Sequence, residues 1–498
     1  MLEAFIIGLG AAFTLSGCGA IISGSAVGLI FGALPGLGGI VALAVVLPFT
    51  FGMDPLTAML FLAGVMGAVP FGGSIPAILL NTPGTGPNAA TCFDGFPMTQ
   101  KGESRRALGI SATASGLGAL FGLVVLMVLL PLVRAVVLTF GPPEFFLLVM
   151  LGLASVALAA RGNLLKGLIA AGIGVIISLI GYSQIFGTLR FTFGSEYLWD
   201  GIELVPFVIG MFAISEVINY TTKGGTITTA GATTGGRIID GVKDVFRHWP
   251  LFLRSSATGT GIGILPGVGG TAANFIAYVV AKTTSKHPEK FGTGIPEGVI
   301  GPESANNAKD GGALLPTVGF GIPGSGEMAV LLGAFTLHGL EPGPLLVRDH
   351  LEVVMVLVLG LVFSNVIASS FGLLAARFLS KVAYIDVKYI APIVTVLCFL
   401  GAYAIRGSIW DVIVAILCGF LGYGLSKAGY PIVCLVIGFV LGFIAERAFH
   451  QSLMMSFGSY TVFFSDAASI VLFVLLVLVL LFPFIRIIVR RRSSGKAQ

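Results

Sequence analysis

Long runs without a charged residue dominate this sequence and limit what it can fold into. The run Val353–Ala376 contains no Asp, Glu, Lys or Arg, and a helix crosses a bilayer with about 20 apolar residues. Charged residues make up 10% of the 498 residues, whereas soluble proteins average about 25%. The composition therefore excludes a soluble enzyme, a nucleic-acid-binding protein and a disordered scaffold. We predict an all-α protein that crosses the membrane many times.

Several uncharged runs are candidate membrane spans, the shorter ones with help from flanking residues. They are Ala107–Val133, Phe145–Ala160, Gly167–Leu189, Leu204–Ser215, Val353–Ala376, Tyr389–Ile405, Val412–Ser426, Tyr430–Ala445 and Ala467–Ile485. Cytoplasmic loops collect Lys and Arg. With the Arg-rich C-terminus inside, most of the 28 basic residues fall in inside loops. We therefore predict a periplasmic N-terminus, without a cleavable signal peptide, and a cytoplasmic C-terminus.

Two motifs occur twice in the same order. Gly32–Gly39 (GALPGLGG) recurs as Gly263–Gly270 (GILPGVGG), and Gly73–Gly86 recurs loosely as Gly312–Gly326. The loops after equivalent motifs carry opposite charge bias, basic in one half and acidic or mixed in the other. The same motif order with reversed charge bias is typical of inverted-topology repeats.

The first motif of each half falls in a stretch that a single crossing does not explain. Ser255–Ala281 is uncharged, but basic residues such as Arg254 and Lys282 flank it on both sides. A re-entrant hairpin keeps both flanks inside, with the Pro-Gly turn at its tip in the membrane. Ala4–Met53 would form the mirror-image hairpin, entered from the outside.

Each repeat should also contain a broken helix, unwound near the bilayer centre at Asn81–Gly84 and at Gly321–Ser325. The repeats predict four parts of the chain. Residues 1–220 form the first transmembrane repeat, and 221–254 a cytoplasmic linker with a possible interfacial helix. Residues 255–445 form the second repeat, and 446–498 a C-terminal transmembrane helix with a basic cytoplasmic tail.

The Pro-Gly-x-Gly-Gly turns indicate an anion site. Proline breaks the helix and glycine admits a ligand close to the backbone. Free N–H groups at the start of the next half-helix can then bind a carboxylate. The alternative is that the glycines only allow tight helix packing and that nearby hydroxyls bond to their own helices. The predicted substrate-binding residues are Pro35, Gly36, Gly38, Gly39, Gly72, Gly73, Ser74, Asn81, Pro83, Gly84, Pro266, Gly267, Gly269, Gly270, Thr271, Ser304, Asn306, Asn307, Pro323, Gly324 and Ser325.

The stretch Glu303–Asp310 is the most polar one near a membrane-embedded segment. A carboxylate inside a membrane is costly and marks candidate functional sites. Candidates for coupling to Na⁺ or H⁺ are Glu303, Asn306, Glu327 and Asp94. The alternative is an ion pair of Lys309 with Glu303 or Asp310 at a cytoplasmic interface. The sequence contains no Walker A motif and no metal-ligand spacing of His or Cys, so we expect no metal, no cofactor and no ATP hydrolysis.

Together the motifs resemble the TctA-like family, the large membrane subunit of tripartite tricarboxylate transporters. The match spans nearly the whole chain and rests on Leu34–Gly39, Gly72–Gly84, Asp94–Met98, Leu265–Gly270, Glu303–Ala308, Gly321–Ser325 and His338–Pro344, with small departures at Phe71 and Phe96. The resemblance implies a bacterial inner-membrane secondary transporter for carboxylates, driven by an ion gradient. It also implies a small TctB-like membrane subunit and a periplasmic TctC-like solute-binding protein as partners. Citrate-like, dicarboxylate and aromatic substrates all occur in the family, and the sequence selects none.

Two other functional classes stay open at this point. A channel-like anion pathway would use the same turns without saturable, receptor-dependent flux. An intramembrane serine hydrolase would use Ser325 as nucleophile and His338 as base. The duplicate motif carries Thr85 without a matching histidine, which disfavours the hydrolase.

Overall fold

The computed structural model describes residues 1–137, 139–159, 164–183, 185–223, 235–382, 385 and 387–494. Within these ranges the regular structure is helical except for one antiparallel hairpin, β1 (Gly181–Ser183) and β2 (Thr188–Arg190). Gly181 pairs with Arg190 across this hairpin. The all-α prediction is confirmed. Residues 224–234 of the predicted linker and the last four residues of the tail lie outside the described ranges.

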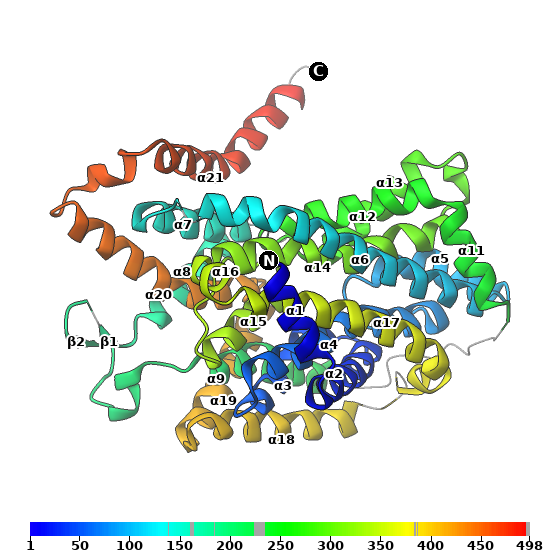
Figure 1. Cartoon of the computed structure of the whole chain (residues 1–498), viewed down its shortest axis with the longest axis horizontal. Coiled ribbons are helices and arrows are strands. Elements are labelled where there is room, and N and C mark those ends of the chain that lie inside the picture. The colour runs from blue at the N-terminus through cyan, green and yellow to red at the C-terminus, as the bar shows by residue number, and fades with distance from the viewer. Residues whose placement is uncertain are drawn as a thin grey trace. The chain divides into compact units, whose positions relative to one another are not determined.

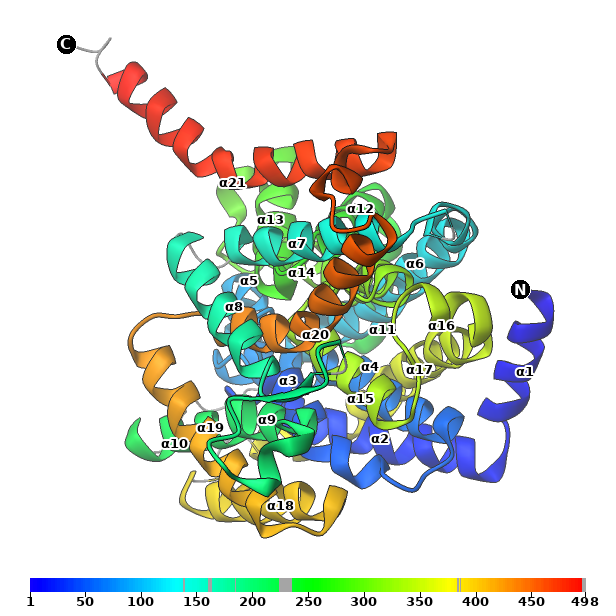
Figure 2. The same ribbon diagram turned by 90° about the vertical axis from the view of Figure 1, so that its left-hand side faces the viewer.

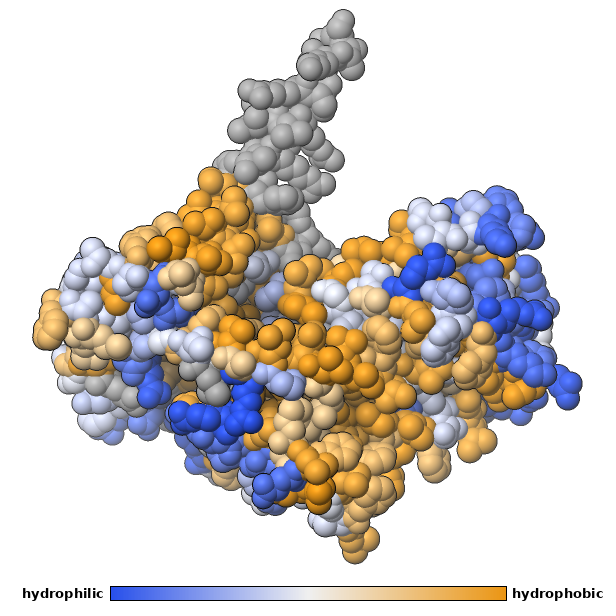
Figure 3. Space-filling view, turned by 45° about the horizontal axis from the view of Figure 1, so that its top comes forward, coloured by the Kyte–Doolittle hydropathy of each residue, from blue (hydrophilic) through white to orange (hydrophobic). Residues whose placement is uncertain are grey.

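Eight helical segments of the described chain are long and apolar enough to cross a membrane. They are α2 (Leu15–Ala33), α4 (Pro55–Leu80), α6 (Ser104–Val137), the Leu204–Thr222 segment, α17 (Leu351–Val382), α18 (Val387–Arg406), α19 (Ile409–Lys427) and α20 (Ile432–Met455). Figure 3 shows hydrophobic residues over much of one face, with hydrophilic residues gathered on the side where α11 (Ile238–Arg247) lies. This supports a polytopic membrane protein.

One expected span is wrong in its second half. The run Gly167–Leu189 enters α8 (Leu164–Ser178), but the helix ends at Ser178 and the chain turns into β1. Gly181 has a φ of 112°, which a helix cannot contain. Uncharged composition alone did not separate this hairpin from a helix.

The chain divides into two compact units. Unit 1 comprises Met1–Arg134 and Leu204–Tyr423, and unit 2 comprises Ala135–Glu203 and Gly424–Gln498. The predicted repeat boundaries follow the motifs instead and stay predictions. All candidate site residues lie in unit 1.

Unit 2 is organised around α20, which packs against α7 (Pro142–Ala159) and α8. Helix α21 (Ala467–Ser494) packs against α7. Arg190 of the hairpin holds Glu446 of α20 through two bonds of 2.5 and 3.0 Å. The unit also contains the short 3₁₀ helices η2 (Glu196–Asp200) and η5 (Tyr460–Phe464).

Unit 1 contains the remaining elements (Figure 1). They are α1 (Leu2–Ala12), α3 (Gly38–Val46), η1 (Leu47–Thr50), α5 (Ala89–Gln100), α9 (Leu204–Val208), the π-helix η3 (Ile209–Ile214), α10 (Ser215–Lys223), α11, α12 (Trp249–Ile264), α13 (Gly269–Thr284), η4 (Pro288–Lys290), α14 (Pro296–Phe320), α15 (Gly326–Leu337) and α16 (Pro344–Asp349).

Two sets of elements recur in the same order within unit 1. α2, α3, α4 and α5 correspond to α12, α13, α14 and α15, because the repeated motifs occupy equivalent breaks between them. Glycines allow the paired helices to approach closely: a Cβ on Gly28 would overlap the Val65 carbonyl of α4, and one on Gly263 the Lys309 carbonyl of α14. That the two sets form a structural repeat, and that they cross the membrane in opposite orientations, stay predictions.

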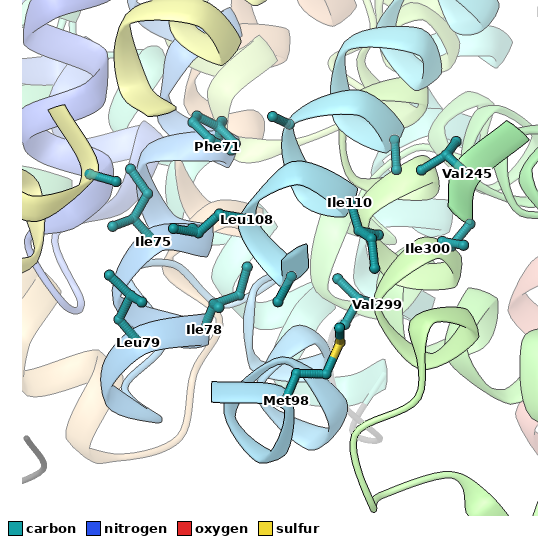
Figure 4. Close-up of a cluster of buried hydrophobic side chains, with 14 of the residues drawn as sticks. Phe71, Ile75, Ile78, Leu79, Met98, Leu108, Ile110, Val245, Val299 and Ile300 are labelled. Carbon is teal, nitrogen blue, oxygen red and sulfur yellow. The ribbon is translucent and has the colours of Figure 1, made fainter. Parts of the chain in front are cut away.

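Helices α4 and α14 form the interior of unit 1 (Figure 2). Every residue of α14 from Gly298 to Gly319 is buried. Figure 4 shows an apolar cluster in which side chains from α4, α5, α6, α11 and α14 meet. Its labelled members are Phe71, Ile75, Ile78, Leu79, Met98, Leu108, Ile110, Val245, Val299 and Ile300. The same helices carry the polar groups described below.

Candidate substrate and ion site

The two long interior helices end at the predicted breaks. Asn81 follows α4 in the left-handed conformation with a φ of 54°, and Gly321 follows α14 with a φ of 70°. Past each break a backbone N–H reaches back to a proline carbonyl, from Thr82 to Pro76 (3.3 Å) and from Ile322 to Pro316 (3.2 Å). Such interrupted helices leave backbone groups free to meet a ligand.

The two Pro-Gly turns share one backbone conformation. Gly36 and Gly38 have φ values of 86° and 59°, and Gly267 and Gly269 have 77° and 73°. Glycine adopts such angles without steric penalty. The N–H of Gly36 donates to the carbonyl of Gly84 at 3.0 Å, and that of Gly267 donates to the carbonyl of Gly324 at 3.0 Å. Each turn is therefore tied to the helix break of its own half.

The helices that follow the turns begin without a side-chain cap. Neither α3 nor α13 has a capping hydrogen bond at its N-cap residue. The first N–H groups of a helix have no intrahelical partner and lie at the positive end of the helix dipole. A Cβ on Gly38 or Gly269 would meet no atom within 4 Å. Open space beside an uncapped helix start is a suitable place for an anion.

Each Pro-Gly turn lies against residues of the other half of the chain. A Cβ on Gly39 would overlap the carboxylate of Glu327 in the second half, and a Cβ on Gly270 would lie 3.0 Å from Pro87 in the first half. The Gly270 Cβ would also overlap the side chain of Lys309 in its own half. A Cβ on Gly86 would lie 2.7 Å from the Thr271 hydroxyl. Both turns and both breaks therefore form one neighbourhood, which we call the turn site (residues 35–39, 84–88, 266–271, 309–310 and 324–327).

Lys309 supplies the positive charge of the turn site. Its Nζ lies 2.5 Å from an Asp310 oxygen and 3.3 Å from a Glu327 oxygen. The Lys309 and Asp310 side chains are 5% and 6% exposed and that of Glu327 is 20% exposed. The Lys309–Asp310 pair considered from the sequence therefore exists, but it is buried inside the protein.

Glu303 precedes Lys309 on the same helix, α14, and is surrounded by hydroxyl groups. Its carboxylate accepts hydrogen bonds from Ser74 (2.8 and 2.9 Å), Ser111 (2.7 Å), Ser115 (2.9 Å) and Thr91. The side chain is fully buried. Among the described ion pairs Glu303 takes part in none. We call Glu303 and these four hydroxyls the hydroxyl cage.

Buried amides between these two clusters lack partners. Both side-chain atoms of Asn306, and the amide oxygens of Asn274 and Asn307, have no hydrogen bond within the described part of the chain. Asn306 is 1% exposed. Residues three apart on a helix are neighbours on its surface, so Asn306 lies between Glu303 and Lys309. Burying an unpaired amide is costly, so these atoms are candidates to receive a ligand.

Asp94 is held in a different way. Its carboxylate accepts the N–H groups of Gly292, Gly294 and Ile295 at 2.8–3.1 Å and the Tyr278 hydroxyl at 2.9 Å. These donors fix the loop that leads into α14. The contacts favour a structural role over ion coupling.

Other predicted site residues are spread over packing and capping positions. Gly72 lies against Leu29 of α2 and Gly73 against the Asn88 side chain. Ser304 bonds to the Ile300 carbonyl of its own helix. Ser325 caps α15 by accepting the Met328 N–H at 3.3 Å. Pro35, Pro83, Pro266 and Pro323 flank the turns and breaks, and Asn81 is exposed.

The hydrolase pair predicted as an alternative takes other partners. His338 lies 3.1 Å from the Thr50 hydroxyl, and Ser325 serves as the α15 cap. No hydrogen bond joins Ser325 to His338 in the described chain.

Sequence reasoning missed Asn88, Thr91, Ser111, Ser115 and Asn274, and treated Lys309 only as a member of an ion pair. Ser111 and Ser115 are four residues apart on α6, a spacing that places them on one face. This pair of serines on one face of an otherwise apolar helix was the sequence pattern that could have identified them as site residues. Asn88 and Thr91 directly follow the first break, where local sequence gives no indication of distant partners.

Comparison with known proteins places this arrangement in a family. The model of the tripartite tricarboxylate transporter TctA family matches residues 19–437. The chain belongs to the TctA family. A relative from Agrobacterium vitis, named "Uncharacterized 52.8 kDa protein in TAR-I ttuC' 3'region", is 33% identical over 443 residues, which are 89% of this chain and 88% of the relative. A second A. vitis relative, "Uncharacterized protein in TAR-II ttuC' 3'region", is 35% identical over 231 residues, 46% of this chain and 96% of the relative. No solved structure gives a significant match.

TctA membership gives the chain a general role. The family is a transporter family, and its members are large membrane subunits of tripartite tricarboxylate transporters. Membership therefore implies TctB-like and TctC-like partners. The apolar helices agree with a multi-pass membrane subunit.

Proposed function

We propose that this TctA-family chain is the permease subunit of a binding-protein-dependent symporter in the bacterial inner membrane. It takes up carboxylates of the tricarboxylate or dicarboxylate type. The TctC-like receptor delivers the anion from the periplasm, and the small TctB-like subunit completes the membrane complex. An Na⁺ or H⁺ gradient drives uptake, without a cofactor and without enzymatic chemistry.

The observation that carries this proposal is that two uncapped helix starts lie beside one buried ion cluster. The turn before α3 contacts Glu327, and the turn before α13 contacts Lys309, which itself bridges Asp310 and Glu327. Two helix dipoles and an ammonium group would bind a carboxylate without a dedicated arginine. Such a site binds with moderate strength, which suits a carrier that must release its cargo.

The unpartnered amides extend the site along α14. Asn306 has two free polar atoms and Asn274 has one, and both lie on helices that border the turn site. A carboxylate accepts N–H bonds from an amide, and a hydroxyl of a citrate-like substrate donates to an amide oxygen. We assign Asn306 and Asn274 to substrate recognition on this basis.

Inverted orientation of the two halves would give the turn site its alternating access. If α2–α5 and α12–α15 cross in opposite senses, one turn faces the periplasm and the other the cytoplasm. Each turn would then admit the anion from one side. The equivalent Gly36–Gly84 and Gly267–Gly324 bonds support a common origin of the two halves.

The test uses the complete system reconstituted in liposomes with citrate, succinate and benzoate as probes. Gly38→Leu and Gly269→Leu fill the open space beside each helix start and should abolish uptake, with normal amounts of protein in the membrane. Gly52→Leu and Gly407→Leu are matched controls, since both glycines also have a positive φ (83° and 65°) and also face open space. The controls should transport as the wild type does.

Three outcomes would contradict the proposal. Normal uptake by both turn variants would leave the turns as packing elements only. Robust uptake by this chain alone, without receptor and small subunit, would refute the tripartite function. Flux that does not saturate with substrate would favour a channel.

A further inference from the structure

The hydroxyl cage and Asn88 form a connected set of hydrogen bonds between Glu303 and the turn site. We propose that Glu303 is a proton-binding site of this chain, and that Asn88 is the positioning residue that links its protonation to the Gly84–Asn88 segment of the turn site. The inference deepens the proposed function, since it selects H⁺ over Na⁺ as the coupling ion.

The hydrogen bonds of the cage can accommodate Glu303 both as a carboxylate and as a neutral carboxyl group. Donors from three helices converge on Glu303: Ser74 from α4, Thr91 from α5, and Ser111 and Ser115 from α6. A carboxylate can accept all of them, because it only accepts hydrogen bonds. A neutral carboxyl group donates one bond itself, so one hydroxyl must then find another acceptor.

Ser74 has that second acceptor. Its hydroxyl lies 2.8 and 2.9 Å from the Glu303 oxygens and 3.0 Å from the carbonyl of Pro70. Within the described contacts of the other three, Ser115 has a further acceptor only at 3.5 Å. When a proton adds to a Glu303 oxygen, the Ser74 hydrogen turns to Pro70. The proton comes from hydronium, which becomes water, and within the protein no covalent bond other than the new O–H forms or breaks.

Asn88 controls which way Ser74 points. Its amide nitrogen donates to the Ser74 oxygen at 2.8 Å and to the Pro70 carbonyl at 3.0 Å, so it touches both alternatives. Its amide oxygen accepts from Thr85. Asn88 occupies the N-cap position of α5 but makes no capping bond, although Asn is a favoured cap. The side chain is instead turned towards α4.

The segment at the other end of Asn88 borders the turn site. Gly84 accepts the Gly36 N–H, and Pro87 lies against Gly270 and accepts an Asn274 N–H at 3.1 Å. A carboxylate that binds at the turns moves these backbone contacts. Asn88 passes that shift to Ser74 and hence to Glu303.

The contacts favour a proton over a sodium ion. A hard cation is held by oxygen lone pairs that converge on it. In the cage the hydroxyl hydrogens already point at the carboxylate, and the Asn88 N–H occupies a lone pair of Ser74. The proton needs no such coordination shell.

Few other titratable groups share this environment. Cys92 of α5 interacts electrostatically with Glu303. α4 carries no charged residue. The charged residues of the other helices that carry the cage are Asp94 on α5, Arg105, Arg106 and Arg134 on α6, and Glu297, Lys309 and Asp310 on α14. Helices α12 and α13, which pack against α14, carry Arg254 and Lys282.

Infrared difference spectroscopy of the full-length purified chain between acid and alkaline pH tests the proton site. The wild type should show the carbonyl stretch of a protonated buried carboxyl group, and Glu303→Gln should lack it. Thr99→Val is the matched control, because Thr99 is a buried α5 hydroxyl that bonds to the Ile78 carbonyl outside the cage. A band that persists in Glu303→Gln, or that Na⁺ removes at constant pH, would overturn the proton assignment.

Asn88→Ala and Ser74→Ala test the link. Each removes a donor that favours the Glu303 anion, so the midpoint of the infrared titration should move up by about one pH unit. Thr85→Val should give a smaller shift in the same direction, and it keeps the link testable if Asn88→Ala does not fold. Unchanged midpoints in both Asn88→Ala and Thr85→Val would overturn the role of Asn88.

Transport by the reconstituted complex separates this inference from the proposed function. Glu303→Gln should still exchange internal for external carboxylate, with citrate, succinate and benzoate as probes, but lose accumulation driven by a pH gradient. Accumulation by Glu303→Gln at the wild-type level would refute the inference and leave the transporter intact. Absence of carboxylate transport by the wild type would refute the proposed function, while the infrared titration still decides the proton site.

Discussion

Removal of the Lys309 ammonium group is the sharpest test of the turn site. Lys309→Met keeps the length and apolar stem of the side chain and deletes one charge. Asp310 and Glu327 would then face each other without a cation, since Lys309 Nζ lies 2.5 Å from one and 3.3 Å from the other. The variant tests stability and anion binding together.

The burial of these groups sets the expected magnitude. Asp310 is 6% exposed and cannot regain water, whereas Glu327 is 20% exposed and is partly solvated. Breaking a buried ion pair by removal of one partner costs about 3–5 kcal/mol. Most of this loss should come from Asp310. Lys309→Met/Asp310→Asn should therefore recover more than half of the lost stability.

Thermal unfolding of the purified chain in detergent is the assay, with anion uptake measured in parallel. Lys282→Met is the control, since Lys282 lies exposed at the end of α13 and should change stability by less than about 0.5 kcal/mol. The double variant should remain inactive although it is more stable, because it still lacks the cation. A Lys309→Met protein with wild-type stability would refute the buried ion cluster, and wild-type uptake would refute the role of Lys309 at the anion.

Three further outcomes follow from the contacts. Asp94→Asn should lower thermal stability by about 2–3 kcal/mol, because an amide cannot accept all the N–H groups that fix the loop before α14. The variant should keep the Glu303 infrared band, and loss of the band would make Asp94 part of the proton site. In unit 2, a double-mutant cycle of Arg190→Met and Glu446→Gln should give a coupling of about 1–2 kcal/mol, and additive effects would show that the pair is not formed. The last outcome concerns single cysteines placed at exposed positions of a chain whose native cysteines are replaced by alanine. Cysteines at Lys286 and Arg105 should react with an impermeant thiol reagent from the cytoplasm, and those at Asp54 and Arg348 from the periplasm. Labelling of Asp54 and Lys286 from the same side would exclude inverted halves.

The helix breaks and turns were predictable because proline and glycine act locally. The motifs Asn81–Gly84 and Gly321–Ser325 begin where α4 and α14 stop, and their proline and glycine residues mark these positions in the sequence. Uncharged runs likewise located most spans. They failed between Ser178 and Leu189, where a glycine-containing hairpin has the same apolar composition as a helix.

The partners of the buried polar groups were not predictable from local sequence. Glu303 meets hydroxyls that are 188 to 229 residues away in the chain, and the Asn88 amide nitrogen binds Pro70 and Ser74 across the first helix break. Asp94 stays an ion-coupling candidate of the sequence, but in the structure its carboxylate binds the backbone N–H groups of a loop, which local sequence did not indicate. Tertiary contacts decide between these roles, and one sequence contains no record of them.

The charge balance of the interior gives a physical reason for coupling. The turn site and the hydroxyl cage together hold three carboxylates, Glu303, Asp310 and Glu327, and one ammonium group, Lys309. With every group ionised this interior is already negative, and unpaired charges are costly in a medium of low dielectric constant. A substrate that brings further carboxylates would be repelled unless a positive charge enters with it. A proton on Glu303 removes one negative charge close to the turn site, so protonation and anion binding favour each other, and each must raise the affinity for the other by the same factor. If Glu303 is the proposed proton site, symport follows from electrostatics, because the anion then binds best to the form of the protein that has taken up the proton.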